Sequence, residues 1–367
     1  MTGVLWGIAA LAGAYQFIAL LACLRHWTRK AWPPHPDHPG VSILKPVRGT
    51  PAGFDEALRS HISQDYPTFE MLAGHRHPND PAVPDLERSG VPHFVCPQQM
   101  PNAKVAVLAG LLPHARYPIL IVNDADIAVP PDYIRDVTAP LADPRIGVVT
   151  CLYRAEGSSL PARFEALGVA TDFAPSTLVA PLFGVSEFGF GSTLAFRRTD
   201  LDAIGGFAAI SDYLADDYQL GARIHHLGRR NLISHVTVRT ILHAATWSDV
   251  WRHQVRWART IRVSRFWGYA FLPITFATFW TLVILIAGLW PAALALLALR
   301  LTVAIVCGFF ILKSRDVLLH LWAIPVRDLF GVAVWAAGLR GNTVEWGGET
   351  LHLDRRGRII NGESHAA

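Results

Sequence analysis

"PILIVNDADIAVPPDYI", residues 118–134, joins a short apolar run to two aspartates that stand one residue apart. An apolar run of this length is typical of a strand that is buried on both faces of a sheet. Ligands of open α/β sheets bind beyond the carboxyl ends of the strands, where Asp124 and Asp126 would lie. Two carboxylates so close repel each other unless a cation lies between them, and Mg²⁺ binds one or two carboxylates together with phosphates. A solvated turn at a strand end is the simpler explanation of this motif when it is taken alone.

The segments around this motif alternate between strand and helix patterns. Apolar runs predict further strands at 41–44, 68–74 and 146–153, and helical spacing predicts helices at 54–62 and 102–115. Such alternation favours an α/β fold, with helices covering both faces of a sheet.

The composition exceeds what a water-soluble core needs, because 51% of the 367 residues are hydrophobic and only 17% are charged. Residues 1–24 carry no charge and are followed by Arg25, Arg29 and Lys30, which predicts a membrane span whose C-terminal end is cytoplasmic. The alternative is a cleaved signal peptide. It would have positive residues before the apolar run and a small-residue cleavage site, and neither is evident.

The C-terminal part is apolar as well. No charge occurs at 266–299, and a further apolar segment at 317–339 is interrupted by Arg327 and Asp328, which we expect to pair inside a bundle or to mark an interfacial bend. Because positive residues favour the cytoplasm, the basic tail disfavours three complete spans, so one segment is expected to be re-entrant or to lie flat. The predicted organisation begins with an anchor (1–25), a proline-rich linker (26–40) and an α/β domain (41–246). A basic amphipathic helix (247–268), two or three membrane segments (269–341) and a cytoplasmic tail (342–367) follow.

Charge and cysteine content exclude some classes of function. The net charge of +4 resides in basic residues beside apolar segments, which is typical of the flanks of membrane spans, so we expect no nucleic-acid partner. The four cysteines are scattered without metal-ligand spacing and are interpreted as small hydrophobic residues in a reducing compartment.

Two further motifs carry charged groups. "SDYLADDYQLGARI" (211–224) places Asp216 and Asp217 where a loop enters a helix. Helix capping would account for one of them but hardly for both, and a carboxylate there could act as a general base for an attacking hydroxyl. "WRHQVRWARTIRVSR" (251–265) aligns three arginines on one helical face, where they could meet a pyrophosphate or lipid headgroups. Positive flanking charge before a span explains Arg262 and Arg265 equally well.

Together these motifs resemble the ceramide glucosyltransferase family, a membrane branch of the family 2-like glycosyltransferases, which includes hopanoid-associated enzymes. The resemblance rests on "VSILKPVRG", "HPNDPA", "NDADIAVPPDYI", "FGFGSTLAFRR", "LADDYQLGARI" and "HQVRWART" in order and approximate spacing, and it continues to "WGGETLHLDRRGRI" near the end. It implies a GT-A domain with a mixed, mostly parallel sheet. It also implies inverting transfer of glucose or N-acetylglucosamine from a UDP-sugar to a lipid hydroxyl, ceramide or a hopanoid-type alcohol, at the cytoplasmic face of the inner membrane.

The resemblance also implies roles for individual residues. Asp124 and Asp126 correspond to the Asp-x-Asp motif that holds Mg²⁺ or Mn²⁺ on the diphosphate, and Asp217 corresponds to the catalytic base. Lys45 and Lys104 would lie beside the nucleotide, although a strand-ending turn is nearly as good an account of the proline and glycine in "KPVRG". The segment "HQVRW" matches the family's (Gln/Arg)-x-x-Arg-Trp element near the donor and acceptor, which is formed here by His253, Arg256 and Trp257.

Three positions depart from the family pattern. His77 stands where the family has an aspartate that contacts the nucleotide base, so either the His77 ring accepts a hydrogen bond from uracil or Asp80 takes over this contact. His253 replaces the leading Gln or Arg, and "NAKVAVL" lacks a second asparagine after Lys104. Two other classes stay open: a processive polysaccharide synthase, which usually has more spans and a full Gln-x-x-Arg-Trp, and a non-catalytic membrane adaptor that binds nucleotide.

Overall fold

The computed structural model describes residues 2–242, 246–346 and 349–360, so the end of the predicted tail, 361–367, lies outside the described residues. The chain forms two compact units. We call residues 30–153, 185–241 and 358–360 the sheet unit, and residues 2–29, 154–184 and 242–357 the helical unit. Each unit is described by itself.

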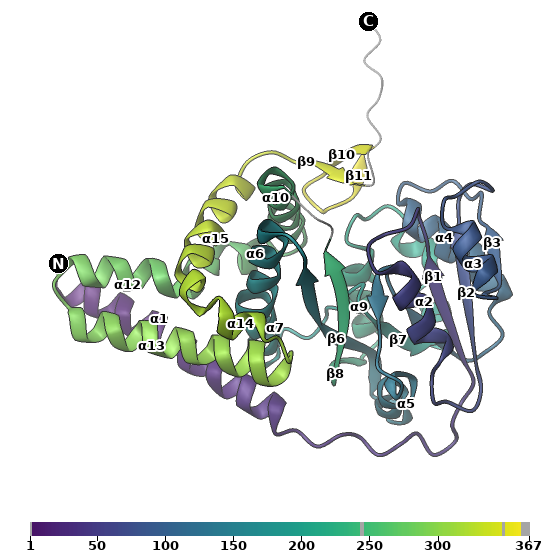
Figure 1. Cartoon of the computed structure of the whole chain (residues 1–367), viewed down its shortest axis with the longest axis horizontal. Coiled ribbons are helices and arrows are strands. Elements are labelled where there is room, and N and C mark those ends of the chain that lie inside the picture. Colours follow the sequence, from purple (N-terminus) through teal and green to yellow (C-terminus); the bar gives the residue numbers. More distant parts are fainter. Residues whose placement is uncertain (1, 243–245, 347–348, 361–367) are drawn as a thin grey trace, which may run out of the picture. The chain divides into compact units, whose positions relative to one another are not determined.

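The sheet unit is built on an eight-stranded sheet with the order β3-β2-β1-β4-β7-β6-β8-β5 (Figure 1). One half is parallel, since β1 pairs with β2 and β4, and β2 pairs with β3. The other half contains antiparallel pairs, β4 with β7, β6 with β7, and β5 with β8. The strands are β1 (Val41–Pro46), β2 (Phe69–His75), β3 (His93–Val95), β4 (Ile119–Val122), β5 (Ile127–Ala128), β6 (Ile146–Gly157), β7 (Leu194–Arg197) and β8 (Arg230–Leu242).

Both faces of this sheet are buried, as the apolar run of β4 predicts. Ile119 and Ile121 belong to one hydrophobic cluster, and Leu120 and Val122 belong to a second cluster on the opposite face. The helices of the unit are α2 (Phe54–Ile62), α3 (Val83–Arg88), α4 (Ala103–Leu111), α5 (Tyr133–Thr138), α8 (Arg198–Ala203) and α9 (Asp216–His226). The predicted α/β arrangement is therefore confirmed, and the predicted strands and helices match the observed ones closely.

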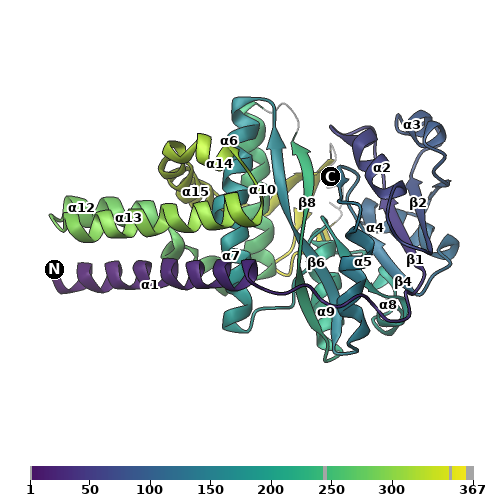
Figure 2. The same ribbon diagram turned by 60° about the horizontal axis from the view of Figure 1, so that its bottom comes forward.

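The helical unit contains the apolar segments. Its helices are α1 (Thr2–Trp27), α6 (Leu160–Gly168), the π-helical η3 (Val169–Phe173), α7 (Ala174–Val179), α10 (Trp247–Ser264), α11 (Phe266–Ala270), α12 (Ala277–Ile286), α13 (Trp290–Ala304), the π-helical η7 (Ile305–Ile311), α14 (Asp316–Leu319) and α15 (Ile324–Gly338). A hairpin of β9 (Thr343–Trp346) and β10 (Glu349–Leu353) follows α15. Helices α1, α12 and α13 lie side by side in both views (Figures 1 and 2), and small residues such as Ala12, Ala277 and Ala293 are buried where they meet.

Among the described residues, four helical stretches are long and apolar enough to cross a membrane: Trp6–Trp27, Leu160–Phe183, Trp290–Ile311 and Leu321–Gly338. The first and the last two fall in the predicted anchor and the predicted C-terminal membrane segments, where α12 adds a shorter apolar helix. The stretch Leu160–Phe183 was not predicted. Its mean hydropathy is 1.3, against 2.5 for Trp290–Ile311, because Arg163, Glu165 and Asp172 interrupt it. The predicted domain 41–246 runs through this stretch, whereas the contacts of the structure group it with the helical unit.

Arg327 and Asp328 pair inside the helical unit, which was one of the two expected alternatives, but each pairs with a residue of another helix and not with its neighbour. Asp328 accepts hydrogen bonds from Nε and Nη2 of Arg300 in α13, at 2.9 and 2.6 Å. Arg327 instead donates to the side-chain oxygen of Gln254 in α10, at 2.8 Å. Adjacent helix residues point about 100° apart, so each reaches a different neighbouring helix.

Candidate active site

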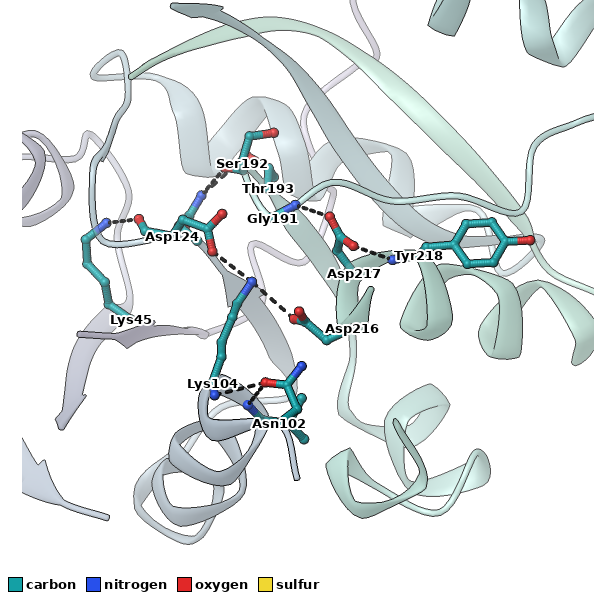
Figure 3. A network of polar contacts seen from close by, with 12 residues as sticks. Lys45, Asn102, Lys104, Asp124, Gly191, Ser192, Thr193, Asp216, Asp217 and Tyr218 are labelled. Carbon is teal, nitrogen blue, oxygen red and sulfur yellow. Dashed lines mark hydrogen bonds and ion pairs between the residues drawn. The ribbon is translucent and has the colours of Figure 1, made fainter. Parts of the chain in front are cut away.

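Lys104 joins two of the acidic segments that the sequence singled out (Figure 3). Its Nζ lies 2.7 Å from Oδ1 of Asp124 and 3.1 Å from Oδ2 of Asp216. Burial opposes the charge of this lysine, but Asp124, Asp216 and Asp217 together raise its pKa above the usual range. Lys104 is therefore a permanent cation between the carboxylate beyond β4 and the carboxylate that begins α9.

The start of α4 fixes the position of Lys104. The buried Asn102 is the N-cap residue, and its side-chain oxygen accepts hydrogen bonds from the backbone N–H groups of Lys104 and Val105. The side-chain nitrogen of Asn102 donates to the carbonyl of Tyr213, at 2.8 Å. One side chain therefore holds both the helix that carries Lys104 and the loop that leads to Asp216.

The backbone of Gly191 connects Asp217 with Asp124 (Figure 3). Its N–H donates to Oδ2 of Asp217 at 3.0 Å, and its carbonyl accepts from the backbone N–H of Asp124 at 2.9 Å. A Cβ atom at this position would lie 2.3 Å from Oδ2 of Asp124, so no larger residue fits without displacing that carboxylate. Glycine is required here by close approach, since its φ is not positive.

The loop that contains Gly191 is held by buried hydrogen bonds on both sides. Thr150 in β6 accepts from the N–H of Phe190, and the hydroxyl of Ser192 donates to the carbonyl of Cys151. The side chain of Asn123 donates to the carbonyl of Ser192 at 2.7 Å. Satisfied buried networks of this kind are rigid, so the Gly191 peptide is a fixed part of the site.

The surroundings of Asp217 raise its pKa and so make it a weaker acid than an ordinary aspartate. Burial and the neighbouring charge of Asp216 raise its pKa to about 6. Lys104 and the N–H of Tyr218, which donates to Oδ1 at 2.7 Å, oppose that rise. The capping explanation does not apply to either aspartate, because the N-cap residue of α9 is Ala215 and both acids lie in the first turn. At neutral pH Asp217 is thus mostly ionised but is basic enough to accept a proton.

Asp126 belongs to the loop beyond β4, and Lys45 of β1 contacts the same loop. Asp126 accepts a hydrogen bond from the hydroxyl of Thr240 in β8, and burial together with Asp124 raises its pKa. Lys45 is fully buried, and its Nζ donates to the backbone carbonyls of Asp124 and Ile127 at 2.9 and 3.4 Å. Burial lowers the pKa of Lys45 to about 8. Lys45 therefore stabilises the loop through its backbone carbonyls.

The donor set at this loop fits a hard divalent cation. Asp124 and Asp126 offer carboxylate oxygens, which suit Mg²⁺ and Mn²⁺. Within residues 2–242, 246–346 and 349–360 no group of three or more His, Cys, Asp or Glu side chains could hold a metal ion. A cation bound here would need further oxygen ligands from a bound molecule or from water.

His77 and Asp80 follow β2, at the same edge of the sheet. Asp80 is buried, and its Oδ1 accepts from the backbone N–H groups of Gly49 and Ala82 at 2.9 and 3.0 Å. The ring of His77 is exposed, while its carbonyl accepts from Nδ1 of His75 at 2.8 Å. The structure thus gives Asp80 a role in holding two loops together and leaves the ring of His77 open to a ligand.

His253, Arg256 and Trp257 lie in α10 of the helical unit. This helix begins with a capping box formed by Thr246 and Asp249. Nδ1 of His253 lies 2.5 Å from Oε1 of Glu165 in α6, and its ring packs against Trp257 with ring centroids 4.8 Å apart. Sequence reasoning assigned no role to Glu165, because a lone glutamate in an apolar stretch gives no pairing signal.

Two residues of the site, Asn102 and Gly191, escaped prediction, and the sequence singled out Asp216 without its contact to Lys104. Contacts through the backbone or through a lysine from another element leave no periodic pattern in a sequence. The only available signal was their presence inside the quoted segments "NAKVAVL", "FGFGST" and "LADDYQLG".

The mixed sheet, its helical layers and the carboxylates at one edge define a GT-A glycosyltransferase fold. The solved mannosyltransferase PcManGT from Pyrobaculum calidifontis shares this fold, with a TM-score of 0.54 and 23% identity over 91% of this chain and 97% of that one. The model of glycosyl transferase family 21 matches residues 4–359. The chain belongs to glycosyl transferase family 21.

Curated relatives of the chain are ceramide glucosyltransferases. Ceramide glucosyltransferase 1 of Caenorhabditis elegans is 28% identical over 218 residues, which is 55% of this chain and 45% of the relative. The ceramide glucosyltransferase of Komagataella phaffii is 28% identical over 142 residues, which is 35% of this chain and 28% of the relative. The chain thus spans less than half the length of these relatives.

Proposed function

We propose that this protein is a membrane-bound inverting glycosyltransferase, which moves glucose or N-acetylglucosamine from a UDP-sugar to the hydroxyl group of a lipid. The observation that carries the proposal is the Gly191 peptide, which ties Asp217 to the Asp124 loop. A proton acceptor and a diphosphate-binding carboxylate are the two functions that such a transfer needs close together. Family membership supports sugar transfer as the reaction class.

In this proposal Asp124 and Asp126 hold Mg²⁺ or Mn²⁺. The metal would offset the negative charge that develops on the departing diphosphate. The complex of the mannosyltransferase PcManGT with GDP-Man and Mn²⁺ supports a nucleotide-sugar donor and a divalent cation. Lys104, which already contacts Asp124, adds a fixed positive charge next to the same group.

Asp217 acts as the general base. Its pKa of about 6 leaves it ionised at neutral pH, so it can accept the proton of the acceptor hydroxyl while that oxygen attacks the anomeric carbon. The N–H of Gly191 holds Oδ2, which fixes the direction of the carboxylate. Attack opposite to the departing diphosphate gives inversion at the anomeric carbon.

The nucleotide and the acceptor are assigned to the remaining predicted residues. The exposed ring of His77 contacts the nucleotide base in place of an aspartate, Asp80 holds the loop that carries His77, and Lys45 supports the metal-binding loop. His253, Arg256 and Trp257 in α10 contribute to binding of the donor and acceptor. We assign the enzyme to the inner membrane with its sheet unit in the cytoplasm, where ceramide or a hopanoid-type alcohol would supply the hydroxyl. The apolar helices support a membrane protein, and the ceramide glucosyltransferase relatives support a lipid acceptor.

The test compares Asp217→Asn with the unmodified protein in membranes supplied with radiolabelled UDP-glucose or UDP-N-acetylglucosamine. Loss of the base should reduce transfer by about 10²–10⁴-fold while donor binding persists. The matched control is Asp202→Asn, an exposed acid of α8, which should leave transfer unchanged. If Asp217→Asn transfers sugar normally, the assigned base is wrong, and if the unmodified protein transfers none, it is not a transferase for these donors.

Lipid analysis identifies the acceptor. Mass spectrometry of cells that express the protein, against cells that lack it, should reveal one new glycolipid. A hexosylceramide would identify ceramide as the acceptor, and a glycosylated hopanoid would identify the alternative. Accessibility gives a separate check, since protease added outside intact cells should not cleave residues 41–153 or 185–241.

A further inference from the structure

The loop 211–215 delivers both acids of α9 to the site, so whatever fixes this loop also fixes Asp216 and Asp217. Its inner side is held by Asn102, whose N–H donates to the carbonyl of Ser211 at 2.9 Å and whose side chain donates to the carbonyl of Tyr213 at 2.8 Å. The outer side of the loop is bound by a segment from the far end of the sequence, residues 358–360.

This terminal segment, which contains β11 (Ile359–Ile360), pairs with the loop through its backbone. Tyr213 and Arg358 form an antiparallel β-bridge, and the N–H of Ile359 donates to the carbonyl of Asp212 at 2.7 Å. The side chain of Ile359 is 7% exposed, so separating the segment from the loop would expose this apolar side chain to water. The loop therefore has backbone partners on both sides.

Side chains reinforce this pairing at Tyr213. Nε of Arg358 donates to the Tyr213 hydroxyl at 3.2 Å, and the Arg358 guanidinium lies 5.5 Å from the ring centroid. The guanidinium of Arg223 in α9 lies 5.8 Å from the same ring. Nε of Arg223 is buried and has no hydrogen-bond partner among the described residues, and the ring of Tyr213 offers its guanidinium a cation–π contact.

We propose that the segment Arg358–Ile360 is a positioning element for the proposed base, acting through loop 211–215. It clamps the loop against Asn102 and thereby fixes where α9 begins. The inference rests on the proposed function of Asp217 but concerns residues to which neither the sequence motifs nor the relatives give a role. Arg358 contacts the hydroxyl and the ring of Tyr213, and in this proposal its effect passes through that residue.

The consequence is a specific pattern of kinetic change. The backbone of Asp124 is held by Gly191 and that of the metal-binding loop by Lys45, and neither contact involves the terminal segment. Loosening loop 211–215 should therefore misplace Asp217 while leaving donor binding largely intact. A misplacement of about 1 Å can cost up to about 10²-fold in rate, so a fall in kcat with little change in the donor KM is expected.

The experiment uses the full chain in detergent or membranes and compares Arg358→Ala, Arg358→Lys and Arg356→Ala. Arg356→Ala removes the same charge two residues away, and the hydrogen bond from Arg356 to Asp354 uses the backbone, so alanine keeps it. We expect Arg358→Ala to lower kcat by about 10-fold with the donor KM changed less than about twofold, and Arg358→Lys to recover most of the loss. Arg356→Ala should match the unmodified protein.

Hydrogen exchange of the amides at 211–218 is measured on the same proteins, because it needs no turnover. Exchange should be faster in Arg358→Ala than in Arg356→Ala. Unchanged exchange overturns the clamp, whether or not the protein is a transferase. Faster exchange with unchanged kcat overturns the positioning role, and absence of transfer in the unmodified protein overturns only the proposed function.

Discussion

The backbone N–H of Gly191 lies 3.0 Å from Oδ2 of Asp217 and donates a hydrogen bond to it. Through its carbonyl the same residue also holds the backbone of Asp124. The backbone of one residue thus contacts both the carboxylate of Asp217 and the backbone of Asp124, the two aspartates that the proposed reaction uses.

Gly191→Ala should abolish most activity without unfolding the protein. The new Cβ would lie 2.3 Å from Oδ2 of Asp124, so that carboxylate must leave its position. We expect transfer to fall by about 10²-fold or more and the metal concentration for half-maximal activity to rise, measured as a Mg²⁺ and Mn²⁺ titration. Gly331→Ala is the matched control, because its Cβ would meet only an ordinary contact at 3.5 Å. Equal metal dependence in the two variants would contradict the prediction.

The pH dependence of the reaction should report Asp217. Because the carboxylate form is the base and burial with Asp216 raises its pKa to about 6, kcat/KM should be level above that pH and fall below it. Asp216→Asn removes a charge that raises this pKa, so its acid limb should move to lower pH, although the variant is slower. A limb that stays in place, or moves upward, would exclude Asp217 as the group observed.

Removing the charge of Lys104 should destabilise the fold as well as the site. Lys104→Met leaves Asp124 and Asp216 without their shared cation, and breaking a buried ion pair in this way costs about 3–5 kcal/mol. Thermal unfolding in detergent should show a lower Tm. The double variant Lys104→Met with Asp216→Asn should recover part of the stability but none of the activity. If the double variant is no more stable than the single one, Asp216 is not the group that Lys104 compensates.

Arg300 and Asp328 should show strong coupling in the helical unit. Both side chains are buried, and they form two hydrogen bonds between α13 and α15. In a cycle of Arg300→Met and Asp328→Asn, each single variant should cost about 3–5 kcal/mol and the double variant clearly less than the sum. The exposed pair Arg59 and Asp55, which are 73% and 53% exposed, is the control and should couple by about 1 kcal/mol or less. Additive losses at Arg300 and Asp328 would contradict the pairing.

The sequence was sufficient for strands β1, β2, β4 and β6 and for the acidic edge, but not for β3, β5, β7 and β8. β4 is wholly apolar and buried on both faces, and its end at Asn123 and Asp124 follows from composition alone. The acids of the proposed site were singled out in the same way, because charged groups next to buried elements have few structural explanations.

What the sequence could not show depends on contacts between distant segments. Gly191 acts through its backbone, and Lys45 supports a loop, whereas the family resemblance implied only a place beside the nucleotide. The partner of Asp328 could not be found from spacing, because Arg300 belongs to another helix. The stretch Leu160–Phe183 was missed because its charged residues lower its mean hydropathy. One of these residues, Glu165, pairs with His253, a contact between two helices that the sequence does not show.

The chain path between β6 and β7 has a practical consequence for isolating the half of the protein that carries the carboxylates. The chain leaves the sheet unit at residue 154, near the end of β6, and returns to it at residue 185, before β7. Any uninterrupted fragment that includes both Asp124 and Asp217 therefore also includes the apolar stretch Leu160–Phe183. A version suited to work without detergent needs an internal excision that joins Tyr153 to Val185 through a short artificial linker, in addition to trimming at the ends.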